Sequence, residues 1–197
     1  MAARQAVAIG SLCALLVGCV PGFVEYYRPQ APGGRAVSRA CGTINAPKTI
    51  WQYKMGDVTL EAIVGEDHRD KPPGELILRF FVPVGTKVSL QSKEVSMRTT
   101  LKAQSRKLVL KKMQLYRGTF KKELKNLEST EFEGGTTSEF GLYHGKEIFL
   151  FSAEIQTPIE QELFISVGQI TVDSVVYQVP EIRFVKEKAF SIYPINC

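Results

Sequence analysis

From Ile50 onward, hydrophobic and polar residues alternate along the chain with a period of two, which is typical of strands with one buried face. Residues 58–64 and 95–101 show this alternation, whereas 76–82 and 148–151 are nearly continuous hydrophobic runs, as central strands buried on both faces would be. Turn-forming residues separate about nine or ten such segments. The pattern predicts an all-β fold, an immunoglobulin-like β-sandwich of about 8–10 antiparallel strands.

Two segments depart from this pattern. In 119–127, Phe120, Leu124 and Leu127 stand at i, i+4 and i+7, and Thr119 can cap the N-terminus, which predicts one short helix crossing between the sheets. Residues 131–145 contain several glycines and predict a long loop. Long loops on a rigid sandwich are where binding sites usually lie.

The N-terminus has the pattern of an export signal. Arg4 supplies a positive charge, and residues 6–17 form an apolar run. The run is too short to cross a bilayer as a helix, which needs about 20 residues, but it fits a secretory signal. No later stretch is long and apolar enough to span a membrane, so the sequence predicts no transmembrane helix in the mature protein.

The apolar run ends in Leu16-Val17-Gly18-Cys19. This tetrapeptide resembles the lipobox of bacterial lipoproteins, in which the cysteine is acylated and the leader is removed before it. The resemblance implies that residues 1–18 are a signal peptide and that Cys19 carries lipid such as palmitate, because several acyl chains together anchor a protein stably. In Gram-negative lipoproteins an aspartate after the cysteine often signals inner-membrane retention, so Val20 implies the outer membrane, facing the periplasm. The alternative is a plain secretory signal that ends at a chance cysteine.

Residues 19–40 are expected to be a tether between this anchor and a domain at 41–197. Three prolines and three glycines between residues 21 and 34 disfavour a helix or a central strand. A fully extended tether of about 20 residues would reach roughly 65–70 Å. Phe23, Val24, Tyr26 and Tyr27 are unusual for a linker. They either pack on the domain's own surface or contact the membrane or a partner.

Four cysteines are present, of which Cys13 lies in the leader and Cys19 in the lipobox. The remaining two, Cys41 and Cys197, are an even pair in an exported protein, which predicts a disulfide bond. In the chain-entropy model, a loop of about 156 residues closed by this bond contributes on the order of 5 kcal/mol. The alternative is two free thiols.

No catalytic or cofactor motif is present. The chain lacks G-x-S-x-G, S-x-x-K, H-E-x-x-H and the glycine-rich nucleotide-binding signature. Residues 67–70, Asp-His-Arg-Asp, precede a proline-rich turn and are interpreted as a solvated loop. A two-histidine metal site would require the loops of His68 and His144 to meet. We predict no catalytic residue, no metal site and no cofactor.

Basic residues concentrate in the middle of the chain. The net charge of +5 is too small to indicate a nucleic-acid partner, and an exported lipoprotein rarely meets nucleic acid. Between residues 98 and 125, however, ten basic residues stand against a single acidic residue, Glu123, and these basic residues could form one face. It would suit anionic lipid head groups or lipopolysaccharide, or it would be a solvated face whose lysines guard edge strands. Its members are Arg98, Lys102, Arg106, Lys107, Lys111, Lys112, Arg117, Lys121, Lys122 and Lys125.

These observations predict a lipid-anchored lipoprotein of the periplasm or outer membrane with a non-catalytic binding or structural role in the cell envelope. Its partners would be the membrane, through Cys19, and envelope proteins or anionic glycolipid. Two alternatives stay open. One is a periplasmic enzyme with a site around His68 and the 131–145 loop, and the other is a module that binds anionic glycolipid or carbohydrate through the basic face.

Overall fold

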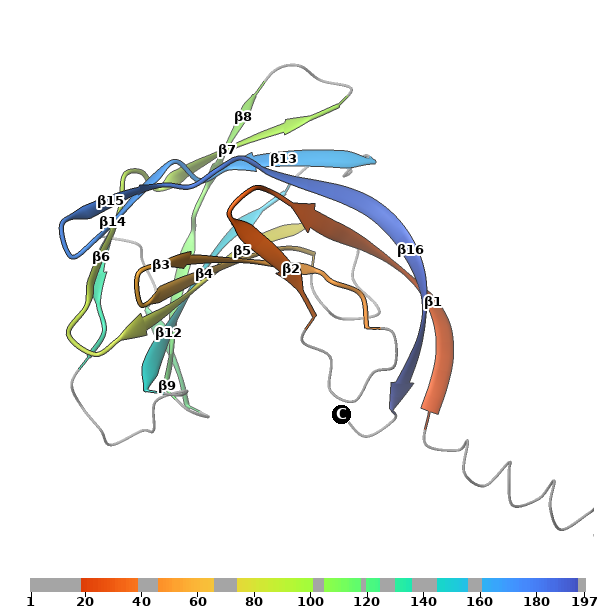
Figure 1. Cartoon of the computed structure of the whole chain (residues 1–197), viewed down its shortest axis with the longest axis horizontal. Coiled ribbons are helices and arrows are strands. Elements are labelled where there is room, and N and C mark those ends of the chain that lie inside the picture. Colours follow the sequence, from red (N-terminus) through yellow and green to blue (C-terminus); the bar gives the residue numbers. More distant parts are fainter. Residues whose placement is uncertain are drawn as a thin grey trace, which may run out of the picture.

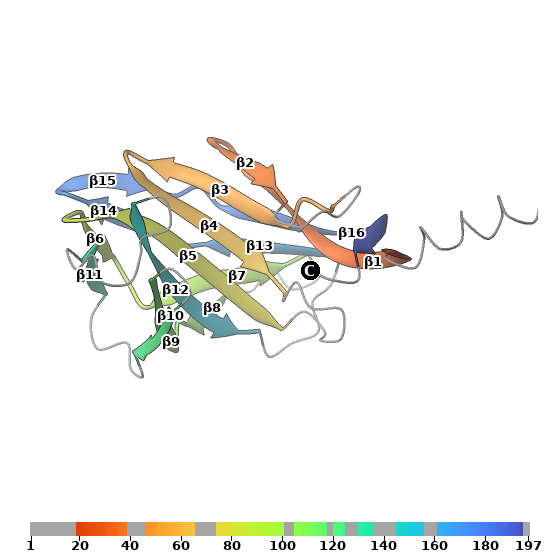
Figure 2. The same ribbon diagram turned by 90° about the horizontal axis from the view of Figure 1, so that it is seen from below.

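The fold is an all-β sandwich, as predicted. The computed structural model describes residues 19–38, 46–65, 74–100, 105–117, 120–124, 130–135, 145–155 and 161–194, and within them it contains sixteen strands and no helix. The strands form three sheets in which every ladder is antiparallel. Figures 1 and 2 show the two larger sheets as facing layers.

Each sheet has a simple order. The seven-stranded sheet runs β10 (Phe120–Leu124), β9 (Lys112–Arg117), β12 (Lys146–Glu154), β5 (Glu75–Pro83), β4 (Val58–Val64), β3 (Ile50–Met55) and β2 (Gly34–Val37). The five-stranded sheet runs β1 (Cys19–Gln30), β16 (Ile182–Pro194), β13 (Glu162–Ser166), β7 (Glu94–Thr99) and β8 (Arg106–Val109). A four-stranded sheet at one end runs β11 (Glu131–Glu133), β6 (Lys87–Leu90), β14 (Gln169–Val172) and β15 (Val175–Gln178).

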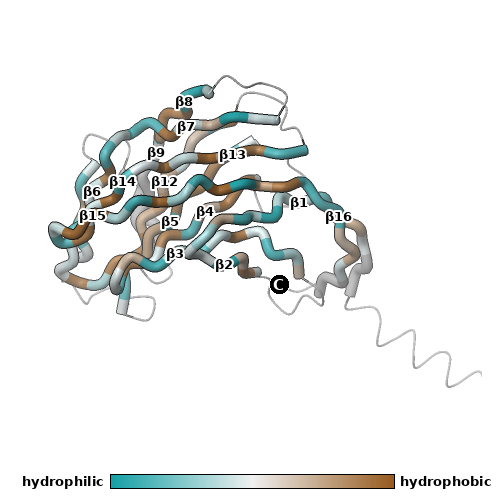
Figure 3. The backbone as a smooth tube through the Cα atoms, turned by 45° about the horizontal axis from the view of Figure 1, so that its top comes forward, coloured by the Kyte–Doolittle hydropathy of each residue, from teal (hydrophilic) through white to brown (hydrophobic). Residues whose placement is uncertain are grey.

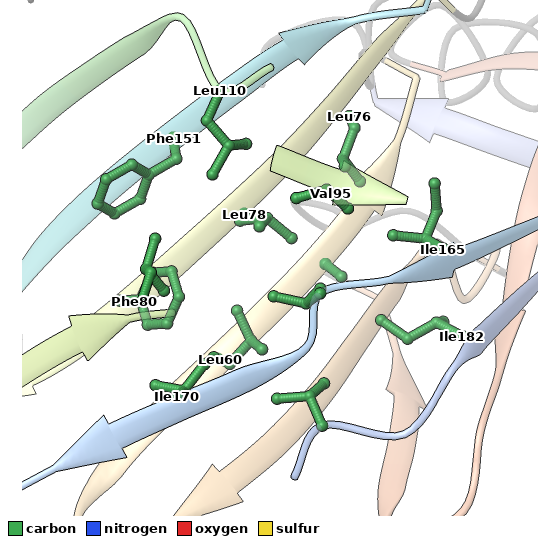
Figure 4. Close-up of a cluster of buried hydrophobic side chains, with 14 of the residues drawn as sticks. Leu60, Leu76, Leu78, Phe80, Val95, Leu110, Phe151, Ile165, Ile170 and Ile182 are labelled. Atoms are coloured by element: carbon green, nitrogen blue, oxygen red, sulfur yellow. The ribbon is translucent and has the colours of Figure 1, made fainter. Parts of the chain in front are cut away.

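One hydrophobic core joins the three sheets, as the close-up in Figure 4 shows. On β4 the alternation read from the sequence holds on the core side, where Val58, Leu60, Ala62 and Val64 are all buried. On β5, Leu78 and Phe80 are fully buried and face the other sheets. Burying such side chains against a second layer is the main term that stabilises a sandwich. Figure 3 shows the same alternation of hydrophobic and hydrophilic positions along the strands.

The predicted helix at 119–127 is wrong where the structure describes it. Phe120–Leu124 is the strand β10, which pairs with β9 from Phe120 opposite Arg117 to Leu124 opposite Met113. A spacing of four residues fits both a helix and a period of two, so this pair could not distinguish them. A two-turn helix is marginal by itself, whereas the ladder with β9 supplies partners for the backbone.

The predicted tether at 19–40 is also wrong in its described part, because β1 and β2 belong to the sheets. β1 is an edge strand, where proline is tolerated because one side of the strand needs no ladder hydrogen bonds. After the turn at Gly33 the chain crosses to the other sheet, where Trp51 packs so closely that a Cβ on Gly34 would lie 2.3 Å from its Nε1 atom. With sixteen described strands, several of them short, the sandwich has more strands than the 8–10 expected and than the seven to nine of an immunoglobulin domain.

Candidate functional site

β1 and β16 form a long ladder that extends past the rest of the five-stranded sheet. They pair over twelve residues, from Cys19 opposite Pro194 to Gln30 opposite Arg183. β13, on the other side of β16, pairs only with its first four residues, up to Val185. We call residues 19–26 and 187–194 the ribbon. Figure 1 shows it curving away from the two layers on the right.

One face of the ribbon continues the face that points into the core. Near the sandwich this face carries Tyr27 and Phe184, which are buried in the core. Because side chains alternate along a strand, the same face farther out carries Glu25 and then Phe23, which stands opposite Phe190. The core-facing pattern therefore continues beyond the core itself.

Phe23 and Phe190 form an exposed aromatic pair. Their ring centroids are 5.4 Å apart in an edge-to-face arrangement, and the two residues are 70% and 46% exposed. The Nζ atom of Lys188 lies 5.4 Å from the centroid of the Phe23 ring, within the range of a cation–π contact. The pair is thus a small apolar patch with a cation at its border.

Polar contacts brace the ribbon where it joins the sandwich. The Nζ atom of Lys186 lies 2.7 Å from the carboxylate of Glu25, and its hydrogen bond and charge hold the pKa of that carboxyl below its usual value. On the other face, the Tyr26 hydroxyl donates to Glu187 Oε2 at 2.7 Å, and Arg28 Nη2 lies 2.9 Å from Glu187 Oε1. Burial, together with the bond to Glu187, raises the pKa of Tyr26 to about 12, so this hydroxyl stays protonated at neutral pH.

Cys19, the predicted lipidation site, is the first residue of β1 and lies at the outer end of the ribbon. Only its backbone position is described. Phe23 is four residues farther along the same strand, which corresponds to about 13 Å. The ribbon therefore brings the candidate anchor and the aromatic pair together.

The predicted basic face lies along the edges of the two large sheets that are farthest from β1 and β2, where β8 and β10 are the edge strands. Arg98 is on β7, and Arg106 and Lys107 are on β8, the last strand of the five-stranded sheet. Lys111 connects β8 to β9. The hairpin of β9 and β10, at the edge of the seven-stranded sheet, carries the backbone of Lys112, Arg117, Lys121 and Lys122. Lys102 and Lys125 lie outside the described residues.

Acidic side chains from distant parts of the sequence neutralise some of these cations. Lys107 Nζ lies 2.6 Å from Glu94, and Lys111 Nζ lies 3.3 Å from Glu154. Arg98 Nη2 lies 2.5 Å from Glu181, and its guanidinium also covers the ring of Phe164 at 3.8 Å. The positive charge here is smaller than the sequence between residues 98 and 125 indicates.

Other candidates from the sequence cannot be placed. Cys41, Cys197, His68 and His144 lie outside the described residues, as do residues 66–73 and 136–144. The start of the predicted loop at 131–145 is instead the strand β11, after which the backbone N–H of Gly135 donates to the buried carboxylate of Glu147 at 2.8 Å.

In the described part of the chain, no cluster of three or more histidine, cysteine, aspartate or glutamate side chains is suited to hold a metal ion. The same residues contain no helix with the length and hydrophobicity to cross a membrane.

Comparison with known proteins adds no further clue to the site. No protein-family description, no curated protein and no solved structure matches the chain. The residues that the sequence did not bring out are Phe190 and Lys188. These two residues stand opposite Phe23 and Glu25, and this pairing can be predicted only once β1 is recognised as a strand.

Proposed function

We propose that this protein is a lipid-anchored component of the bacterial cell envelope, acylated on Cys19, with a non-catalytic binding or structural role on the periplasmic side of the outer membrane. The observation that carries the proposal is a coincidence at Cys19. The residue completes the lipobox-like sequence Leu16-Val17-Gly18-Cys19 and is also the first residue of β1, at the outer end of the ribbon.

The position of Cys19 supports an anchor held at a fixed distance from the sandwich. Cys19 precedes Tyr27, the first core residue of β1, by eight residues, which corresponds to about 26 Å of strand. A paired strand is far stiffer than a free linker, because both strands of the ladder must bend together. The proposed anchor would hold the sandwich near the membrane and restrict its orientation, unlike a tether that reaches 65 Å or more.

A structural use of the buried carboxylate of Glu61 and of the polar side chains beside it favours a binding or structural role over catalysis. Arg35, Gln52, Glu61 and Arg79 stand side by side across four neighbouring strands. Arg35 donates to Gln52 Oε1, Gln52 donates to Glu61 at 3.2 Å, and Arg79 Nη1 lies 3.3 Å from the fully buried carboxylate of Glu61. This row of contacts holds strands together across the sheet.

The proposal is tested by changing Cys19→Ser in a Gram-negative host that exports the protein. We expect the variant to remain an uncleaved precursor or to lose the mass of three acyl chains and the incorporation of labelled palmitate, measured by mass spectrometry and radiolabelling. Cys13→Ser is the matched control, because this cysteine lies in the leader and its loss leaves the mature mass unchanged. An identical mature mass for the wild type and for Cys19→Ser would contradict the proposal.

Peptide mapping of the unreduced protein tests the cysteine assignment independently. A Cys41–Cys197 bridge is expected, with Cys19 found only in a lipid-modified peptide. The register places Cys19 opposite Pro194, three residues before Cys197 in the sequence. A Cys19–Cys197 bridge in the peptide map would contradict lipidation.

A further inference from the structure

The aromatic pair of the ribbon differs from the phenylalanine pairs in the described part of the core. Phenylalanines 80, 132, 149 and 151 are all buried in the core and contact one another. Phe23 and Phe190 make the same kind of contact with each other, yet both are exposed. Two adjacent exposed rings on one face of a two-stranded ribbon form an apolar surface that can contact a membrane or another protein.

The position of the pair near Cys19 favours the membrane. An acylated Cys19 holds its own backbone at the surface of the bilayer. If the ribbon stood upright, Phe23 would be about 13 Å above that surface, whereas a ribbon lying along the membrane would bring Phe23 to the level of the head groups. Phenylalanine side chains on the apolar face of a peripheral element enter this boundary region.

The charges beside the rings favour the same orientation. Lys188 borders the Phe23 ring and carries a positive charge, and Lys186 compensates Glu25. These three side chains together have a net charge of one positive unit. Lysine can place its alkyl stem along an apolar surface while its ammonium group contacts lipid phosphates.

We propose that Phe23 and Phe190 insert into the head-group region of the bilayer that holds Cys19, with Lys188 at the phosphate level. This inference rests on the proposed function, since it takes the acylated cysteine as the first contact. Two or more acyl chains already anchor a protein stably. The aromatic contact therefore adds little to membrane retention, and its effect is to fix the orientation of the ribbon and of the sandwich behind it.

The test must report depth in the membrane, because binding alone would not change. Phe23→Trp and Phe190→Trp are introduced into the acylated protein, which is reconstituted in vesicles of phosphatidylethanolamine and phosphatidylglycerol containing brominated lipid. The native Trp51 is buried in the core and gives the background. Val176→Trp is the matched control, because Val176 is 59% exposed on β15, which Figure 1 shows at the end of the molecule opposite the ribbon.

We expect the tryptophans at 23 and 190 to emit at shorter wavelength on vesicles and to be quenched by brominated lipid about twofold or more, while Val176→Trp is quenched no more than the wild type. In the Phe23→Trp background, Phe190→Ser should reduce the quenching, and Val109→Ser, an exposed position on β8, should leave it unchanged. Circular dichroism checks that each variant is folded.

The outcomes separate the two proposals. If mass spectrometry finds the triacyl mass and the tryptophan at 23 is quenched no more than the one at 176, the membrane contact of the ribbon is overturned and the proposed anchor stands. A protein without the triacyl mass would overturn the proposed function, and this inference with it.

Discussion

Two aromatic pairs with nearly the same geometry lie in very different surroundings. The centroids of Phe80 and Phe151 are 5.5 Å apart, edge to face, and both residues are fully buried between the sheets. The centroids of Phe23 and Phe190 are 5.4 Å apart, also edge to face, and both residues are exposed on the ribbon. The direct ring contact is worth about the same in both places, so the difference in their contributions must come from burial.

Ion pairs show the same contrast between the sandwich and the ribbon. Glu61 is completely buried and lies 3.3 Å from Arg79, whereas Glu25 and Lys186 are 2.7 Å apart, with 60% of the Glu25 side chain exposed. The shorter distance does not make the ribbon pair the stronger one, because water screens it. The sandwich uses such pairs to hold its fold, and the ribbon leaves its groups available for contact with another surface.

The largest effect is expected from removing a buried ring. Phe151→Ala should lower the free energy of unfolding by about 3–5 kcal/mol, because it loses apolar burial and leaves a cavity between the sheets. Phe23→Ala removes a ring of the same size from the ribbon and should cost less than about 1 kcal/mol. Urea unfolding followed by circular dichroism measures both values. Equal losses would show that the ribbon pair supports the fold as much as the core pair does.

The same contrast explains which parts of the fold can be predicted from the sequence. In the sandwich, alternation within a single segment identifies the buried face, as on β4, because each strand carries its own pattern. The ribbon depends on a pairing between segments far apart in the chain, such as Tyr26 with Glu187. Its prolines and glycines locally favour a linker, and the partner strand supplies what the local pattern lacks.

Two further expectations failed or changed for related reasons. Phe120 and Leu124 are four residues apart, a spacing that a helix and a strand share, and only the ladder with β9 decides between them. The sequence between residues 98 and 125 lists charges that are neighbours along the chain, whereas charge acts through space. Glu154 and Glu181 come from outside the segment and pair with two of its cations. The lipobox resemblance depends on adjacent residues alone, so it needs no tertiary information.

An intermediate effect is expected from the buried ion pair. Arg79→Ala would remove the guanidinium that pairs with the buried carboxylate of Glu61 and should destabilise the protein by about 1–3 kcal/mol. Arg79→Lys keeps the charge and should cost less. The double variant Glu61→Gln, Arg79→Ala should recover part of the loss, since the buried charge is gone. Urea unfolding of the wild type, the single variants Glu61→Gln and Arg79→Ala and the double variant gives the coupling energy. Stability unaffected by Arg79→Ala would contradict this role.

The smallest effect is expected from acid, and it should fall on the five-stranded sheet that carries the ribbon. Three carboxyl groups there have pKa values below the usual 4.5, each chiefly through a hydrogen bond from a basic side chain on another strand. The pairs are Glu25–Lys186, Glu162–Arg183 and Glu181–Arg98.

The direction of this pH dependence follows from the lowered values. A carboxyl group whose pKa is lower in the folded state stabilises the fold fully above its unfolded pKa, and this contribution disappears as the pH falls through the folded pKa. Because the pairs are partly exposed, we expect the triple glutamine variant to differ from the wild type by less than about 4 °C in melting temperature at pH 7, and by progressively less as the pH falls from 4.5 toward about 2.5. Glu133→Gln, on β11 outside this sheet, is the control. Melting curves whose difference stays constant between these pH values would show that the three pairs do not stabilise the sheet.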